Sequence, residues 1–225
     1  MTSALFVVSQ EGYWGEECVE PLTTLDERGI EITVATPTGQ PPIVDEVSID
    51  PDEVGSDTAE WVHEIDETDD RLNDPIPLAH ANADEYDVVV FPGGHGTVWD
   101  INQDVRARTL LRDTIENDKL ALVICHAVGL LGFTRASDGS FLVDGRDVTG
   151  FPNTWESEIT DENERVRGGR KLPYFVEDEV IAAGGTWDAE LDDDVSVTVD
   201  DTLITARGPG SSKAAAETLV SELDQ

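Results

Sequence analysis

Basic side chains, cysteines and long apolar stretches are scarce in this sequence of 225 residues. Its 14 lysines and arginines stand against 49 aspartates and glutamates, a formal net charge of −35. Nucleic-acid binders and proteins that bind anionic membranes need clustered basic side chains, so we expect neither kind of partner. No apolar run reaches the length of a transmembrane helix, and the first residues lack the basic segment of a signal peptide. We therefore expect a soluble, cytoplasmic protein, and the two cysteines are consistent with a reducing compartment.

The acidic residues are spread along the whole chain rather than gathered in a tail. Their mutual repulsion would destabilise a compact fold in dilute buffer. At about 1 M salt the screening length falls to roughly 3 Å, which removes most of this repulsion. The composition therefore indicates a halophilic protein, from a cell with molar salt in its cytoplasm. A partly disordered acidic protein is disfavoured by the regular periodicity of the chain, and no calcium-binding loop motif occurs.

Short apolar segments alternate with amphipathic ones along most of the chain. The apolar segments predict strands at residues 4–8, 30–35, 87–91, 120–124, 195–199 and 203–205. The amphipathic ones predict helices at residues 17–28, 105–117 and 211–223. This alternation predicts an α/β fold, a doubly wound and mostly parallel sheet with helices on both faces, in a flavodoxin-like three-layer sandwich.

We expect one domain spanning residues 1–225, because this length suits a single core. Residues 43–83 form an acidic, insertion-like stretch with weak signals and a short strand near residues 47–49.

Ligands of such sheets bind beyond the carboxyl ends of the strands. Three predicted loops lie there, at residues 9–17, 92–98 and 125–130, and they contain most of the reactive side chains. Cys125 follows a buried strand and precedes a helical segment, a turn that exposes one side chain and directs backbone N–H groups at it. A helix N-terminus would lower the pKa of this thiol and make it reactive. A buried structural cysteine is the alternative.

The loop after the strand at residues 87–91 reads Pro-Gly-Gly-His-Gly from Pro92 to Gly96. Glycine lets the backbone approach a ligand closely and present N–H groups to an oxyanion, which makes Gly93 and Gly94 candidate oxyanion residues. A plain tight turn is the competing explanation. His95 either lines the pocket or only positions the backbone.

These loops resemble those of the ThiJ/PfpI superfamily, in its heat-shock-protein-31-like, glyoxalase III branch. The resemblance rests on Glu17, on the Gly-Gly-His-Gly loop and on Cys125-His126-Ala127, and it extends to Gly-Tyr-Trp at residues 12–14 and Val-Thr-Gly-Phe at residues 148–151. It covers nearly the whole chain. It implies a nucleophile at Cys125, an adjacent His126, and an acid from the first helix, for which Glu17 fits better than Glu16. On residues alone, an ordinary acidic helix start is the favoured interpretation of Glu17.

The sequence departs from the family pattern at two places. Ala127 and Val128 replace a usual Gly-Pro, which adds bulk beside the nucleophile. Asn153 stands where some branches have an aspartate that orients the histidine, and an amide supplies no charge. Glu156 or Glu158 are alternative partners for His126.

The four histidines also restrict the chemistry, because none follows His126. The triad of class I glutamine amidotransferases needs a later His-x-Glu pair, so glutamine hydrolysis is not expected. Histidines and carboxylates show no recognisable metal-ligand spacing, so we expect no metal site. We expect Cys18 to be a core residue, with a resolving partner of oxidised Cys125 as the alternative.

The resemblance implies a cofactor-independent glyoxalase that converts small 2-oxoaldehydes such as methylglyoxal to 2-hydroxy acids through a cysteine hemithioacetal. A PfpI-type cysteine peptidase or amidase is an alternative, although adjacent Cys125 and His126 are expected to be poorly placed for direct proton transfer. A non-enzymatic stress chaperone or peroxide sensor is a further alternative. The resemblance also implies a homodimer.

Overall fold

A central seven-stranded sheet organises the chain, and the computed structural model describes residues 2–161, 166, 169–188 and 195–225. In spatial order its strands are β3 (Ile76–Pro77), β2 (Glu31–Thr36), β1 (Ser3–Val7), β4 (Val88–Phe91), β5 (Leu120–Ile124), β9 (Leu203–Ala206) and β8 (Val197–Asp200). All neighbours are parallel except β8, which pairs antiparallel with β9 at one edge. Two further short strands, β6 (Asp147–Val148) and β7 (Thr186–Trp187), pair separately. The predicted mostly parallel sheet is confirmed.

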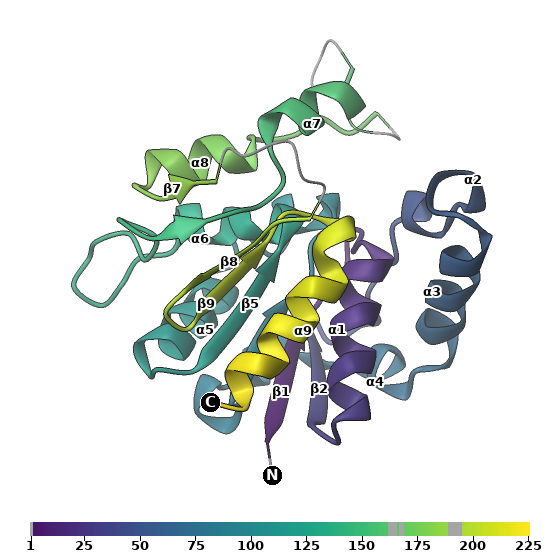
Figure 1. Cartoon of the computed structure of the whole chain (residues 1–225), viewed down its shortest axis with the longest axis horizontal. Coiled ribbons are helices and arrows are strands. Elements are labelled where there is room, and N and C mark those ends of the chain that lie inside the picture. The colour runs from purple at the N-terminus through teal and green to yellow at the C-terminus, as the bar shows by residue number, and fades with distance from the viewer. Residues whose placement is uncertain (1, 162–165, 167–168, 189–194) are drawn as a thin grey trace.

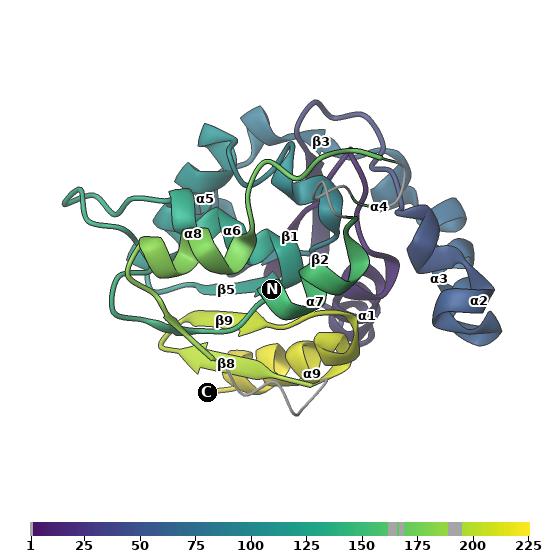
Figure 2. The same cartoon turned by 90° about the horizontal axis from the view of Figure 1, so that it is seen from above.

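Helices cover both faces of this sheet, as Figure 2 shows from above. Helices α1 (Gly15–Glu27) and α9 (Ser212–Leu223) pack side by side on one face (Figure 1). Helices α5 (Val105–Glu116) and α6 (Gly129–Phe133) cover the other, and α8 (Val176–Ala182) packs on α6. Strand β1 divides its side chains between two cores, since Leu5 and Val7 face one and Ala4 and Phe6 the other. A strand buried on both faces needs such a continuous apolar run.

The stretch at residues 43–83 is more regular than the sequence indicates. It contains η1 (Glu46–Ile49), α2 (Pro51–Val54), α3 (Ser56–Thr68), α4 (Asp70–Asn73) and η2 (Leu78–His80), followed by η3 (Ala83–Glu85). The predicted strand near residues 47–49 is wrong, because these residues form a 3-10 turn that Asp45 caps by accepting from Val47 N–H. Helix α3 gave a weak signal because it buries only Ala59 and Val62. Val62 packs against Gly15, which joins α3 to the outside of α1.

The loops after β1, β4 and β5 meet at one edge of the sheet, together with α7 (Asn153–Ile159). The loops after β4 and β5 lead into the 3-10 turns η4 (His95–Val98) and η5 (Cys125–Val128). A further turn, η6 (Pro209–Ser211), precedes α9. Asp100 holds the first two loops together, since it accepts hydrogen bonds from Ser9 Oγ at 3.0 Å and from Gln10 N–H at 2.7 Å. In the described part of the chain, no helix has the length and apolarity needed to cross a membrane.

Candidate active site

Cys125 lies at the turn from β5 into η5 and has a φ of +57°. This left-handed conformation is uncommon for a residue with a side chain, and here the packing of a buried strand end enforces it. The backbone N–H groups of Gly94 and His126 interact with the sulfur. The predicted turn and its two N–H donors thus surround Cys125.

Glu17 lies in the first turn of α1, is completely buried, and reaches the same sulfur. Neither of its carboxyl oxygens has a hydrogen-bond partner of standard geometry among the described residues. Burial raises the pKa of Glu17 to about 8, and contacts with the Cys125 thiol and the Gly93 backbone oppose this rise only in part. Glu17 is therefore mainly protonated at neutral pH. Glu16 is instead partly exposed and accepts a hydrogen bond from the Trp14 indole.

Gly93 and Gly94 allow this close approach. A Cβ on Gly93 would lie 2.4 Å from Glu17 Oε2 and 2.7 Å from Cys125 Cβ, so only glycine fits between the acid and the thiol. Gly94 has a φ of +101°, and a Cβ there would lie 2.4 Å from the backbone nitrogen of Trp14. The two glycines therefore let the loop after β4 pack closely against Glu17, Cys125 and Trp14.

The sulfur also contacts His126, which forms a relay with Glu156. Its Nδ1 lies 3.1 Å from Cys125 Sγ, and its Nε2 lies 2.6 Å from Glu156 Oε2. The imidazole stacks on Phe151 at a centroid distance of 4.3 Å, which fixes its plane. The expectation that adjacent Cys125 and His126 are poorly placed for proton transfer is wrong, because the left-handed turn at Cys125 brings the two side chains together.

The pKa values of the relay residues leave the imidazole unprotonated and the carboxylate ionised at neutral pH. Burial and the neighbouring His95 lower the pKa of His126 to about 4, so the imidazole is neutral at pH 7. Glu156 is buried too, but its hydrogen bonds with His126 and His95 outweigh burial and lower its pKa to about 2. An ionised carboxylate only accepts hydrogen bonds, so His126 donates from Nε2 and turns the lone pair of Nδ1 toward the sulfur.

The resting thiol itself is not acidified. Burial, and next the neighbouring Glu17 carboxyl, raise the pKa of Cys125 well above its ordinary value, although the N–H groups of Gly94 and His126 act in the opposite direction. The predicted lowering by a helix N-terminus is therefore wrong, since η5 is a single short turn and Cys125 is buried. Cys125 needs a base at the moment of reaction.

Asn153 does not perform the role that the sequence predicted for it. Its Nδ2 donates to Asp178 at 2.8 Å and its backbone N–H to Glu177 at 2.7 Å, so it fastens α7 to α8. Glu156, one turn further along α7, points inward instead. Glu158 is exposed. The spacing of the family motif predicted Asn153 as the partner of His126. Only the helical register of α7 shows that Glu156 is that partner.

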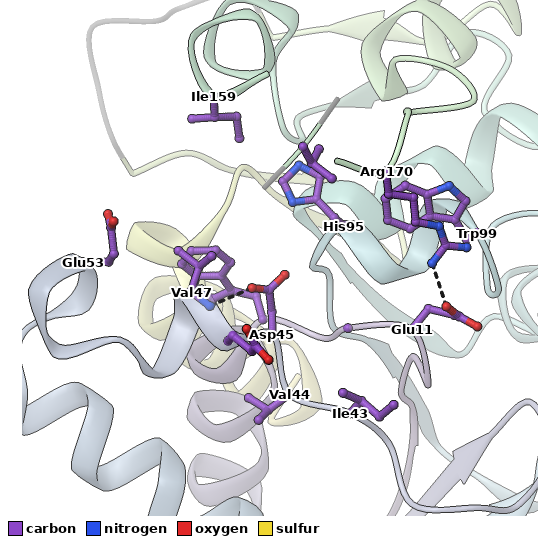
Figure 3. Close-up of a pocket in the computed structure, with 14 residues that line it drawn as sticks. Glu11, Ile43, Val44, Asp45, Val47, Glu53, His95, Trp99, Ile159 and Arg170 are labelled. Atoms are coloured by element: carbon purple, nitrogen blue, oxygen red, sulfur yellow. Dashed lines mark hydrogen bonds and ion pairs between the residues drawn. The ribbon is translucent and has the colours of Figure 1, made fainter. Parts of the chain in front are cut away.

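A pocket of about 610 Å³ opens beside the relay, and His95 lines it. In Figure 3, Trp99 and Arg170 lie on one side of His95, and Val47 and Glu53 lie on the other. Arg170 pairs with Glu11 at 2.7 Å and stacks over the Trp99 ring. The remaining walls are mostly apolar with an acidic rim: Gly12, Trp14, Ile43, Val44, Asp45, Glu46, Ile159 and Val166. Of the two positions considered for His95, the structure shows the one in the pocket lining.

Ala127 and Val128 lie in the apolar core and add no bulk to this pocket. Cys18 is a buried free thiol in the other core, as expected. His95, His126 and Glu156 are the residues that could hold a metal ion, since one ligand atom from each lies within 4.8 Å of the others. Their present hydrogen bonds account for the same grouping without a metal.

The fold and site can now be compared with known proteins. A model of the DJ-1/PfpI family matches residues 2–222. The chain belongs to the DJ-1/PfpI family. The similarity predicted from the motifs is thereby confirmed.

Within the DJ-1/PfpI family, relatives carry different names. The chain is 24% identical over 217 residues to the glutathione-independent glyoxalase HSP31 of Saccharomyces cerevisiae, covering 92% of this chain and 87% of that protein. It is 26% identical over 200 residues to the glutamine amidotransferase-like class 1 domain-containing protein 1 of Bos taurus, covering 88% and 82%. Its fold matches the crystal structure of glyoxalase III from Candida albicans with a TM-score of 0.83 and 19% identity, covering 98% of this chain and 96% of the other.

Proposed function

We propose that this DJ-1/PfpI protein is a glutathione-independent glyoxalase, which converts small 2-oxoaldehydes such as methylglyoxal to 2-hydroxy acids with no cofactor. One observation carries the proposal: the Glu17 carboxyl, whose pKa burial raises to about 8, and the His126 imidazole both contact the Cys125 thiol. The similarity to relatives named glyoxalase supports it.

The first step forms the hemithioacetal. The Cys125 thiol gives its proton to His126 Nδ1, 3.1 Å away, and the sulfur attacks the aldehyde carbon. Glu17 gives its proton to the aldehyde oxygen, while the N–H groups of Gly94 and His126 stabilise the charge that develops there. Glu156 stabilises the imidazolium through its hydrogen bond to Nε2.

The second step moves hydrogen between the two carbons. Glu17, now ionised, takes the proton from the former aldehyde carbon, and the imidazolium returns its proton to the neighbouring oxygen, which gives an enediol. Glu17 then protonates the second carbon and recovers a proton from the hydroxyl of the first, which leaves a thioester of the 2-hydroxy acid. No outside oxidant is needed, because one carbon is oxidised as the other is reduced.

The last step adds water. With His126 as the base, water attacks the thioester carbonyl, the C–S bond breaks, and the thiol is reprotonated. The product is anionic, and the acidic rim of the pocket, with Asp45, Glu46 and Glu53, disfavours its retention.

A cysteine peptidase or amidase is the second candidate, because Cys125, His126 and Glu156 form the relay that such hydrolysis requires. A protonated acid against the thiol, however, has no part in that reaction. The raised pKa of Cys125 also disfavours a peroxide sensor, since thiolates are the species that oxidise.

The test measures methylglyoxal consumption and lactate formation in about 2–3 M KCl, a concentration that screens the acidic surface. Wild type is compared with Cys125→Ala and with Cys18→Ala, the matched control at the other cysteine. We expect lactate from wild type and Cys18→Ala and none from Cys125→Ala. Hydrolysis of a peptide amide without lactate from folded wild-type protein would instead support the peptidase.

A further inference from the structure

Glu156 is shared by two imidazoles. Its Oε2 lies 2.6 Å from His126 Nε2, and its Oε1 lies 3.1 Å from His95 Nε2. The two rings are in contact, with centroids 4.1 Å apart. The carboxylate is buried, with 3% of its side chain exposed, whereas 13% of the His95 side chain is exposed, at the pocket. His95 therefore separates the carboxylate of the relay from the pocket.

This sharing restricts the carboxylate. With both oxygens engaged, Glu156 cannot rotate about its terminal bond without losing one of two hydrogen bonds. A carboxylate that accepts from one imidazole alone could turn either oxygen toward it, or turn toward the pocket. The bond from His95 thus sets the direction from which His126 must donate, and with it the direction of the Nδ1 lone pair toward Cys125.

The charged groups around His95 and His126 act together. Glu156 from α7 and Asp45 before η1 favour a proton on His126, whereas the neighbouring His95 ring disfavours it. Across the pocket, Glu11 and Arg170 form an ion pair, so their opposite charges largely cancel at His126. Among the residues that the structure describes, His95 is in ring contact with His126, and a charge on it would oppose protonation of His126.

We propose that His95 is a positioning residue of the site: by donating to the second oxygen of Glu156, it holds His126 in the tautomer whose Nδ1 accepts the proton of Cys125. The proposal deepens the proposed function, since it concerns activation of the same thiol. It adds a fourth member to the relay of Cys125, His126 and Glu156, and this member lines the pocket.

Nitrogen-15 NMR of histidine-labelled protein tests the proposal directly, since the chain has only four histidines. Wild type is compared with His95→Ala, with His95→Gln, which keeps a donor, and with His63→Ala, the control at a histidine of which over half the side chain is exposed. We expect His126 to carry its proton on Nε2 in wild type, His63→Ala and His95→Gln. In His95→Ala we expect a mixture of tautomers and a pKa of His126 about one unit higher, a tenfold change in its protonation ratio.

The rate of alkylation of Cys125 by iodoacetamide gives a second measurement that needs no substrate. Between pH 5 and 8 we expect alkylation in His95→Ala to be about twofold slower at pH 5 and unchanged at pH 8, and to return to near the wild-type rate in His95→Gln. Folded His95→Ala with the wild-type tautomer, His126 pKa and alkylation profile would overturn the proposal. Because neither measurement uses an oxoaldehyde, a failed glyoxalase assay would leave this result intact and identify the proposed function as the part in error.

Discussion

Glu17 contacts Cys125 and Glu156 contacts His126, and both carboxyls are almost inaccessible to solvent, yet the protein shifts their pKa values in opposite directions. At Glu17 few groups donate hydrogen bonds to the carboxyl, so burial dominates and raises its pKa to about 8. At Glu156 two imidazole donors overcome burial and lower the pKa to about 2. Burial alone does not fix the charge of a carboxyl: the number of donors aimed at it does. One thiol thereby gains both an acid and a base.

Removing the acid should have the largest effect. Glu17→Gln keeps the shape of the side chain and can still donate a hydrogen bond, but it cannot carry a proton from one carbon to the other. We expect lactate formation to fall by about 10²–10⁴-fold. Steady-state kinetics with methylglyoxal would measure it, with Glu16→Gln as the control at the adjacent, partly exposed acid. Near wild-type turnover in Glu17→Gln would mean that another group moves the proton.

Removing the charge of Glu156 should lower the activity less than removing the acid Glu17. In Glu156→Gln a single amide oxygen is left to accept from two imidazoles, so His126 loses the partner that stabilises its charged form. We expect kcat/KM to fall by about 10²-fold, because Glu17 and the backbone donors remain. Glu158→Gln on the same helix is the control. Equal rates for wild type and Glu156→Gln would show that the relay does not activate the thiol.

The two carboxyls also predict opposite pH dependences of stability. The folded state binds the Glu17 proton more tightly than the unfolded chain does, so its contribution is complete at low pH and is lost as the pH rises toward 8. The contribution of Glu156 is present above pH 4.5 and is lost as the pH falls toward 2.

Urea unfolding in 2 M KCl at pH 5, 6.5 and 8 measures the contribution of Glu17 to the free energy of unfolding. The free energy of unfolding of wild type should fall relative to Glu17→Gln over this range, by an amount on the order of several kcal/mol. Parallel curves for the two proteins would contradict a raised pKa at Glu17.

The smallest effect is expected at Asn153, which lies on the same helix as Glu156 but outside the relay. Asn153→Ala removes one hydrogen bond between α7 and α8 and should lower the free energy of unfolding by about 1 kcal/mol or less. Lactate formation should change less than about twofold, as for a residue that contacts no reacting group. A loss as large as that of Glu156→Gln would mean that α7 is positioned mainly through Asn153.

The side of the site that contains Glu17 could be predicted from the sequence, and the side that contains Glu156 could be predicted only in part. Cys125, Glu17 and the two glycines follow strands or open a helix, so their place at the sheet edge follows from the fold. Glu156 stayed one of two candidates beside Asn153, because which face of a seven-residue helix turns inward depends on packing against other segments. The thiol pKa was predicted in the wrong direction, since desolvation arises from tertiary contacts. Likewise, the helix at residues 56–68 buries too few apolar side chains to be predicted from the sequence pattern.

The most direct measurement is the infrared absorption of protonated carboxyl groups at pH 7.2 in deuterated buffer with 2 M KCl. Ordinary carboxyls are ionised there, and Asp100, whose pKa burial raises to about 6, is mostly ionised as well. We predict one carboxyl C=O band that disappears in Glu17→Gln, persists in Glu156→Gln and weakens above pH 8. A band that survives in Glu17→Gln, or that is lost in Glu156→Gln, would contradict the assignment of Glu17 as the protonated acid and Glu156 as the ionised carboxylate of the relay.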